Sequence, residues 1–205
     1  MLNENFILIV SGPSGAGKTT VVNLFLENNR DFILSISHTT RSRRANEVEG
    51  KDYYFVSEED FKDMIEKGEF VEWAEVYGNY YGTSKKEIER ILNNKKNILL
   101  EIDVQGALSV KKSFPEESVL VFILPECFSD LKNRLISRNT EKKKDLEKRL
   151  EVAKNEIEQI NFYDYVIINK YGCEEESSQL LNSIVQVEKI KVKRFWNKIK
   201  NSFWR

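Results

Sequence analysis

Eight consecutive residues near the N-terminus have the types and spacing needed to bind a chain of phosphates. They read Gly12-Pro13-Ser14-Gly15-Ala16-Gly17-Lys18-Thr19 and match the pattern G-x-x-x-x-G-K-[ST]. The glycines allow successive backbone N–H groups to converge on phosphate oxygens, and the N-terminus of the following helix adds partial positive charge. Lys18 would reach the β- and γ-phosphates, and the Thr19 hydroxyl would be placed for Mg²⁺. The pattern therefore predicts a phosphate-binding loop (P-loop).

The segments on either side of this loop agree with that prediction. Residues 6–10 form a short apolar run rich in β-branched side chains, which is typical of a strand buried on both faces. Apolar residues at helical spacing follow from Lys18. Because the motif has this meaning only between a strand and a helix, an ordinary glycine turn is the weaker interpretation. GTPases, ATPase motors and small-molecule kinases all use such loops, and the small size of this chain favours the kinases.

A second candidate site is a cluster of arginines at Arg41, Arg43 and Arg44. Guanidinium groups bind phosphate oxygens through two parallel hydrogen bonds, so three of them within four positions suit a monophosphate. Taken alone, such a cluster is more often a solvated basic loop. The interpretation therefore depends on the segments that follow it.

Apolar patterns in the rest of the chain predict an α/β fold. Buried strands are expected at residues 98–103, 118–124 and 164–169, and amphipathic helices near residues 128–135, 146–157 and 180–185. Buried strands that alternate with amphipathic helices imply a mostly parallel sheet with helices on both faces.

Two segments interrupt this alternation. Residues 37–89 predict a small insertion with strands at 53–56 and 70–74, a helix opened by the capping box of Ser57 and Asp60 and closed by Gly68, and a helix opened at Ser84. Residues 129–159 predict a charged helical hairpin that could act as a mobile lid. The core would consist of residues 1–36, 90–128 and 160–188, with residues 189–205 as a separate tail.

Several further segments resemble the guanylate kinase (GMP kinase) family in order and spacing, from about residue 8 to residue 185. Besides the P-loop, they are Ser37–Arg44, Glu47-x-x-Gly50-Lys51-Asp52-Tyr53-Tyr54-Phe55, Phe70-Val71-Glu72-Trp73, Gly78-Asn79-Tyr80-Tyr81-Gly82-Thr83, Glu101-Ile102-Asp103-Val104-Gln105-Gly106, Arg138-Asn139-Thr140-Glu141 and Arg149-Leu150. The resemblance implies a P-loop nucleoside monophosphate kinase fold with a GMP-binding insertion and a helical lid. It also implies transfer of the γ-phosphoryl group of ATP to GMP, and to dGMP, which gives ADP and GDP.

The resemblance assigns an acceptor site to the insertion. The residues that correspond to GMP-phosphate ligands are Ser37, Arg41, Arg44, Tyr53 and Tyr81. Glu72 and Thr83 correspond to the residues that read guanine. A carboxylate can accept hydrogen bonds from guanine N1–H and the 2-amino group, whereas adenine would leave it unpaired. The alternative for Glu72 is a surface carboxylate on a half-exposed strand.

The same resemblance assigns the residues that act on ATP. The ATP-binding set is Gly12, Pro13, Ser14, Gly15, Ala16, Gly17, Lys18, Thr19, Thr20 and Asn169. The catalytic set is Lys18 and Arg41 with Arg138 and Arg149 of the lid, and Arg134 as a companion. Thr19 would bind Mg²⁺ directly. Asp103 would lie near GMP and the metal, in direct contact with Mg²⁺ or through a water molecule, while Glu101 shares its face of the strand. Asn169 matches an adenine-side asparagine, but Lys170-Tyr171 replaces the acidic pair usual in the family.

The composition limits the other interpretations. With 205 residues and a net charge of −1, the chain gives no reason to expect a nucleic-acid polymer as a partner. Cys127 and Cys173 are too few and too far apart for a disulfide framework or a zinc site with His38, which fits a reducing cytoplasm. No apolar run is long enough for a secretion signal or a membrane span.

Residues 189–205 contain seven Lys or Arg and no acidic residue, together with apolar residues at helical spacing. We favour a final helix that docks on its own domain or on a second subunit of a homodimer, over a helix that lies on an anionic membrane surface or binds another partner. Two competing functions also remain. A protein-binding module of the same fold would not need the complete P-loop, and a kinase for another phosphorylated acceptor would not need Glu72 and Thr83.

Overall fold

The computed structural model describes residues 6–76, 78–137 and 143–192, and the side chains of residues 143–145 are not among those described. The chain divides into two compact units. We call Met1–Glu4, Gly12–Asn29 and Val121–Arg205 the P-loop unit, because it contains that loop. We call Asn5–Ser11 and Arg30–Leu120 the arginine unit, because it contains the arginine cluster.

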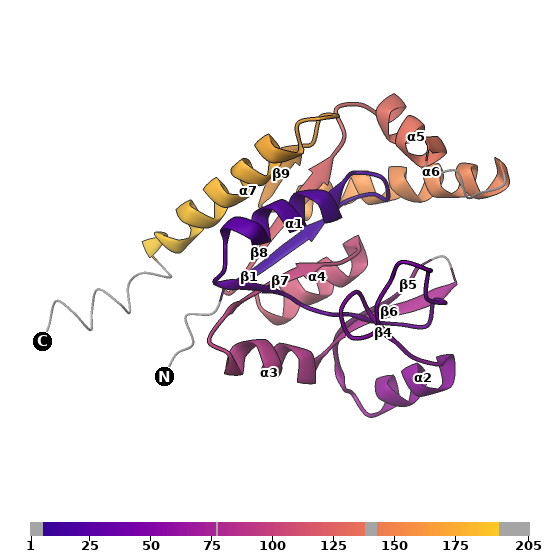
Figure 1. Ribbon diagram of the computed structural model, residues 1–205, viewed down its shortest axis with the longest axis vertical. Coiled ribbons are helices and arrows are strands. Elements are labelled where there is room, and N and C mark those ends of the chain that lie inside the picture. Colours follow the sequence, from indigo (N-terminus) through magenta and orange to yellow (C-terminus); the bar gives the residue numbers. More distant parts are fainter. Residues whose placement is uncertain (1–5, 77, 138–142, 193–205) are drawn as a thin grey trace, which may run out of the picture. The chain divides into compact units, whose positions relative to one another are not determined.

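The arginine unit contains three parallel strands in the order β2-β7-β1, where β1 is Ile7–Ser11, β2 is Phe32–Leu34 and β7 is Asn97–Glu101. Strands β1 and β7 are labelled in Figure 1. All five residues of β1 are buried, as the unbroken apolar run predicted. Strand β7 ends two residues before the predicted limit. Asp103 instead caps helix α4 (Val104–Ser113), because its Oδ1 accepts hydrogen bonds from the N–H groups of Gln105 (2.8 Å) and Gly106 (3.1 Å).

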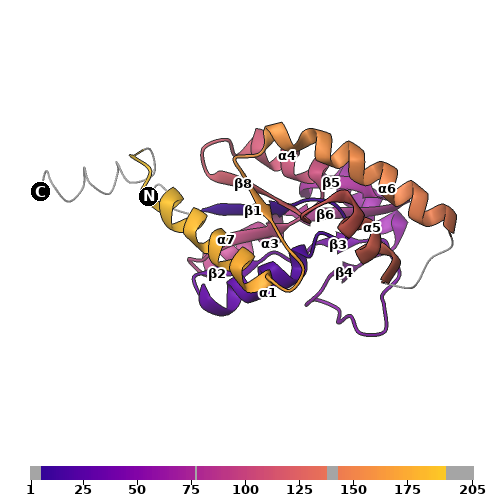
Figure 2. The ribbon, with the colours of Figure 1, turned by 90° about the horizontal axis from the view of Figure 1, so that it is seen from above.

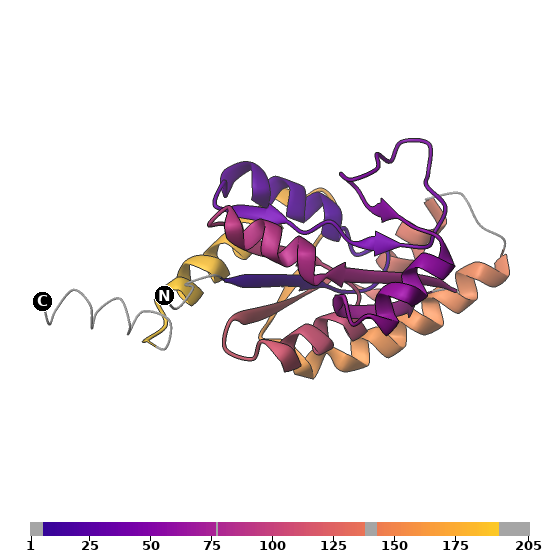
Figure 3. The same ribbon diagram turned by 90° about the horizontal axis from the view of Figure 1, so that it is seen from below.

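The same unit has a second sheet of four strands. Its order is β4 (Tyr54–Phe55), β3 (His38–Thr39), β6 (Asn79–Ser84) and β5 (Phe70–Val76). Helix α2 (Glu58–Glu66) follows β4, and helix α3 (Lys85–Asn93) follows β6. Both predicted helix starts are confirmed, since Ser57 and Ser84 each accept a hydrogen bond from the N–H three residues later. Figure 3 shows the long loop that joins β3 to β4 and carries the arginines.

The P-loop unit is also built of strands and helices. Residues 121–124 of β8 (Ser118–Leu124) pair in parallel with β9 (Tyr165–Ile168). Helix α1 (Lys18–Asn28) packs against α7 (Glu174–Lys189), and the two lie side by side in Figures 1 and 2. The remaining elements are α5 (Phe128–Ser137), α6 (Lys143–Glu158) and the short 3₁₀ helix η1 (Gln159–Phe162). Parallel strands with helices in both units confirm the predicted α/β class.

The hairpin of α5 and α6 contains more apolar packing than its charged sequence indicates. Leu131, Leu135 and Ala153 form a buried cluster, against which Leu146 and Leu150 pack. The polar connection between the two helices falls on residues 138–142, outside the described part of the chain. In the described ranges, no helix is long and apolar enough to cross a membrane. Most of the basic tail, from residue 193 onward, also lies outside the described residues.

Candidate functional site

The P-loop has the backbone that phosphate binding requires. It follows β1 directly and ends where α1 begins, with Gly17 as the N-cap residue in a left-handed conformation (φ 88°). Gly12 has φ 139°, and a Cβ atom there would overlap the carbonyl oxygen of Ile123. Both positions therefore exclude residues with a side chain. The N–H groups at the start of α1 and the positive end of its dipole form an anion site.

The Lys18 side chain is held close to the loop. Its Nζ atom donates hydrogen bonds to the carbonyl oxygens of Gly12 (2.6 Å) and Pro13 (3.2 Å). A positive charge is thus fixed beside the backbone that would surround the phosphates. Thr19 and Thr20 follow in the first turn of α1 and are exposed.

Four residues outside the loop are also predicted to act on ATP, and two of them contact the P-loop backbone. Arg134 lies on α5, and its Nη1 donates to the carbonyl oxygen of Ala16 (3.3 Å). Asn169 follows β9 and donates to the same oxygen (2.8 Å). Arg149 lies half-buried on α6. Arg138 lies outside the described residues.

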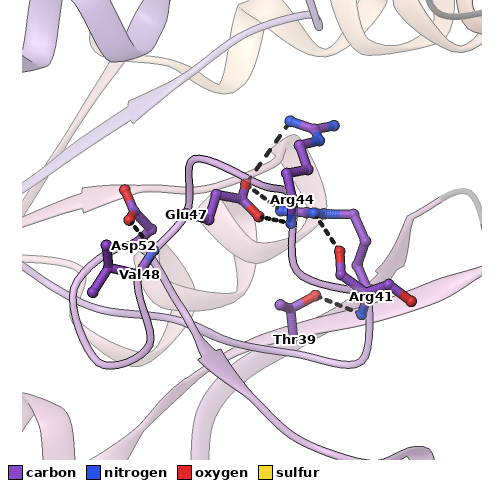
Figure 4. Close-up of polar contacts among 7 residues, drawn as sticks. Thr39, Arg41, Arg44, Glu47, Val48 and Asp52 are labelled. Carbon is purple, nitrogen blue, oxygen red and sulfur yellow. Dashed lines mark hydrogen bonds and ion pairs between the residues drawn. The ribbon is translucent and has the colours of Figure 1, made fainter.

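The arginine cluster is organised by Glu47. Its Oε1 forms an ion pair with Arg41 Nη2 (2.7 Å), and its Oε2 accepts a hydrogen bond from the backbone N–H of Arg44 (2.8 Å), as Figure 4 shows. Burial favours the protonated carboxyl, but these hydrogen bonds outweigh it and lower the pKa of Glu47. The pair is therefore ionised at neutral pH. The Arg44 side chain is 70% exposed, with its Nη1 atom 3.9 Å from Glu47 Oε1, whereas Arg41 is 16% exposed.

Two tyrosines lie beside Arg41. Its guanidinium carbon is 5.4 Å from the centre of the Tyr53 ring, and the rings of Tyr53 and Tyr81 are 6.0 Å apart. Burial, with the nearby negative charge of Glu101, raises the pKa of Tyr53 to about 12, so its hydroxyl remains a hydrogen-bond donor at neutral pH. The structure thus brings three predicted phosphate ligands together. Ser37, another of the five predicted ligands, joins the same sheet through its carbonyl oxygen, which accepts a hydrogen bond from Tyr54 N–H (2.9 Å).

Glu72 and Thr83 form the second part of this site. They are direct partners across β5 and β6, and their exposed fractions are 5% and 0%. The alternative of a surface carboxylate is therefore wrong, because Glu72 shares the buried face of β5 with Phe70 and Ala74 while Trp73 and Glu75 face solvent. Within the described part of the chain, Thr83 Oγ1 makes no hydrogen bond of standard geometry.

The carboxyl of Glu72 is unusually basic. Burial raises its pKa to about 7, the neighbouring Thr83 opposes this shift, and the negative charge of Asp103 adds to it. A buried carboxyl also has lone pairs to accept hydrogen bonds from a ligand. Perturbed groups of this kind are typical of functional sites.

Gly106 is a residue of this site that the sequence did not identify. A Cβ atom built on Gly106, in the first turn of α4, would lie 2.5 Å from Glu72 Oε2 and 3.2 Å from its Cδ. The Glu72 carboxyl therefore occupies the space that a side chain at this position would fill. Glycine is unfavourable in helices, which is a sequence signal that this position has another requirement.

The described residues allow only a limited set of metal ligands. Among them, no group of three or more His, Cys, Asp or Glu side chains could hold a metal ion. Mg²⁺ in kinases is usually held by substrate phosphates, water and one or two protein oxygens. The exposed Thr19 hydroxyl beside the P-loop fits that pattern. Asp103 has one oxygen engaged in capping α4, which leaves the other for a ligand or a water molecule.

Comparisons with known proteins agree with this geometry. The family model described as Guanylate kinase matches residues 4–187. The guanylate kinase of Caldanaerobacter subterraneus subsp. tengcongensis is 44% identical over 191 residues, which cover 93% of this chain and 91% of the relative. That of Clostridioides difficile is 44% identical over 202 residues, covering 98% and 97%. The crystal structure of guanylate kinase from Anaplasma phagocytophilum has a TM-score of 0.79 and 35% identity, and covers 97% of this chain and 95% of its own. This likeness confirms the predicted P-loop kinase fold.

Proposed function

The chain belongs to the guanylate kinase family, and we propose that it transfers the γ-phosphoryl group of ATP to GMP, and to dGMP, giving ADP and GDP. The observation that carries the choice of acceptor is the buried pair of Glu72 and Thr83. An ionised Glu72 accepts from guanine N1–H and the 2-amino group, and the Thr83 hydroxyl donates to O6. Adenine offers no such pair of donors, so AMP would leave a buried carboxylate unpaired.

Around this pair, residues of the arginine unit bind the rest of GMP. The phosphate ligands are Ser37, Arg41, Arg44, Tyr53 and Tyr81, and Asp103 is a further GMP-binding residue. Glu47 supports this role because it holds Arg41 in one orientation before the phosphate arrives. The Tyr53 hydroxyl stays protonated and donates to a phosphate oxygen.

The P-loop unit binds ATP. The phosphates lie against Gly12–Thr20, and Lys18 neutralises charge on the β- and γ-phosphates. Thr19, and Asp103 directly or through a water molecule, would hold Mg²⁺, and the bound ion would supply further charge neutralisation. Arg134, Arg138 and Arg149 complete the cationic surroundings, and residues 129–159 act as a lid that closes over the triphosphate.

The reaction is an in-line displacement. An oxygen of the GMP phosphate forms a bond to the γ-phosphorus while the bond from that phosphorus to the β–γ bridging oxygen breaks, and ADP leaves with the electron pair. The protein forms no covalent intermediate. Its part is alignment and charge stabilisation by Lys18 and the arginines.

A coupled assay for ADP release tests this function. ATP·Mg²⁺ is supplied with GMP, dGMP, AMP, CMP or UMP. The rate of ADP release should be at least about 100-fold higher with GMP or dGMP than with AMP. ADP release that ignores the acceptor, or that prefers another nucleotide, would contradict the proposal.

The pKa of Glu72 predicts a pH dependence. Since only the carboxylate accepts both hydrogen bonds from guanine, kcat/KM for GMP should fall about tenfold per pH unit below pH 7. The phosphate of GMP itself titrates near pH 6. The control is therefore Glu72→Gln. Its pH profile should keep the change that comes from titration of the GMP phosphate and lose the change near pH 7. Profiles of the two proteins that coincide would exclude Glu72 as the titrating group.

Gly106→Ala should raise KM for GMP roughly tenfold with little change in kcat, because the new methyl group displaces the Glu72 carboxyl and weakens one hydrogen bond. IMP lacks the 2-amino group, so its KM should change less. Gln105→Ala, at an exposed position of the same turn, is the matched control. Equal effects on GMP and IMP would show that the methyl group does not act through Glu72.

We also propose a cytoplasmic location, which fits the two free thiols, Cys127 and Cys173. The tail of residues 189–205 would dock on the protein or on a second subunit, in preference to a membrane.

A further inference from the structure

Directly beneath the P-loop lies a fully buried amide. Asn169 follows β9 and has no exposed surface. Its Nδ2 donates a hydrogen bond to the carbonyl oxygen of Ala16 (2.8 Å), and its Oδ1 accepts one from the hydroxyl of Ser177 on α7 (2.9 Å). Both ends of the amide are thus used inside the P-loop unit.

The backbone of Asn169 is fixed as well. Its N–H donates to the carbonyl oxygen of Leu124 (2.6 Å), and its carbonyl oxygen accepts from Arg134 Nη2 (2.8 Å). Arg134 also donates through Nη1 to the carbonyl of Ala16 (3.3 Å), so that one oxygen receives two hydrogen bonds. The amide therefore cannot shift without loss of several contacts at once.

The neighbouring glycine is part of the same arrangement. A Cβ atom on Gly17 would overlap Asn169 Nδ2, so the amide occupies the space beside the last glycine of the loop. This places the amide at the point where the loop becomes helix α1.

The Ala16 carbonyl controls the direction of one N–H group of the loop. The C=O of Ala16 and the N–H of Gly17 belong to one planar peptide, and the described chain contains no cis peptide bond. In a trans peptide these two groups point in opposite directions. The hydrogen bonds that fix the Ala16 carbonyl therefore also fix the Gly17 N–H, which points in the opposite direction. On that face of the loop, successive N–H groups of a P-loop bind the phosphates.

We propose that Asn169 is a positioning residue for the phosphates of ATP, which it serves by fixing the Ala16–Gly17 peptide rather than by contacting the adenine base. The side chain has no exposed surface through which a base could reach it, and both ends of its amide already form hydrogen bonds inside the P-loop unit. The inference rests on the proposed function only in requiring that the P-loop binds a triphosphate. It does not depend on GMP as the acceptor.

Binding measurements on the full chain separate the two roles. Isothermal titration calorimetry with ATP, GTP and inorganic tripolyphosphate, each with Mg²⁺, compares the natural protein with Asn169→Ala. All three should bind about 10- to 100-fold more weakly, by similar factors, since the altered peptide meets only phosphate. GMP affinity should stay within twofold. A selective loss for ATP, with tripolyphosphate unaffected, would overturn the proposal in favour of a base contact, and so would unchanged binding of all three.

Two further variants guard against a general folding defect. Ser177→Ala removes the donor to Asn169 Oδ1 and leaves the amide in place. It should weaken the binding of all three ligands about threefold, while the melting temperature changes little. Asn182→Ala, an asparagine of the same helix that pairs with Gln186, should change none of them. If Ser177→Ala binds tripolyphosphate normally in a folded protein, the bracing role is wrong. ADP release with GMP, measured in parallel on the natural protein, tests the proposed function separately.

Discussion

Replacing Lys18 by alanine should lower kcat roughly 100- to 1,000-fold, the range found when one preorganised donor to a developing charge is removed. The ammonium is already held beside the loop by the carbonyls of Gly12 and Pro13, so it needs no rearrangement to meet the γ-phosphate. Its charge matters most when negative charge passes to the β–γ bridging oxygen. Steady-state assays at saturating ATP and GMP measure the loss.

Two comparisons identify the cause of that loss. Lys18→Arg keeps the charge but places a planar guanidinium where a compact ammonium fits, and it should stay impaired at least about tenfold. Lys112→Ala removes a lysine from the last turn of α4 and should leave kcat unchanged. Calorimetric affinity for GMP should be unchanged in all three variants. Near-normal turnover in Lys18→Ala would remove this residue from the mechanism.

Glu72→Gln should lower kcat/KM for GMP by about 100- to 1,000-fold. The amide keeps the size of the carboxyl but places an N–H₂ group against one of the two guanine donors, and each buried polar mismatch costs about 1–3 kcal/mol. Discrimination against AMP should narrow by a similar factor. Kinetics with both nucleotides under saturating ATP measure the change, and unchanged discrimination would show that guanine is read elsewhere.

The same substitution should also change stability, with a predictable sign. The pKa of Glu72 is raised in the folded protein, so the folded state retains a proton that the unfolded state releases. The stabilisation of the folded state that this proton gives is lost as pH rises through about 7. Glutamine does not ionise, so Glu72→Gln removes that loss. The melting temperature of the variant minus that of the natural protein should therefore be larger at pH 8 than at pH 5.5. Glu75→Gln, on the exposed face of the same strand, should show neither effect.

Local signals in the sequence predicted the elements that can be recognised without their neighbours. The buried strands at β1 and β8 have unbroken apolar runs, and α2 and α3 begin at serines that cap them. Helix α4 was missed because its apolar positions are few and Gly106 interrupts them. The two-residue strand β3 was missed because its pairing with β4 and β6 comes from the fold rather than from its own pattern.

The candidate site shows the same division. The resemblance to the guanylate kinase family predicted Glu72 and Thr83, and the structure places them opposite each other. It could not predict that Glu72 needs the empty space at Gly106, or that Asn169 uses its amide on the P-loop, because these contacts join positions distant in the sequence.

The separation of Ala16 and Asn169 has a consequence for the synthesis of the chain. These residues lie 153 positions apart, and the hydroxyl that holds the amide follows eight positions later. At about 5–20 residues per second, the ribosome would release the loop roughly 8–30 s before the asparagine that braces it. Glu72, Thr83 and Gly106 all emerge within that interval. A nascent chain would therefore contain all three residues of the guanine-binding site while its P-loop still lacked the hydrogen bond from Asn169.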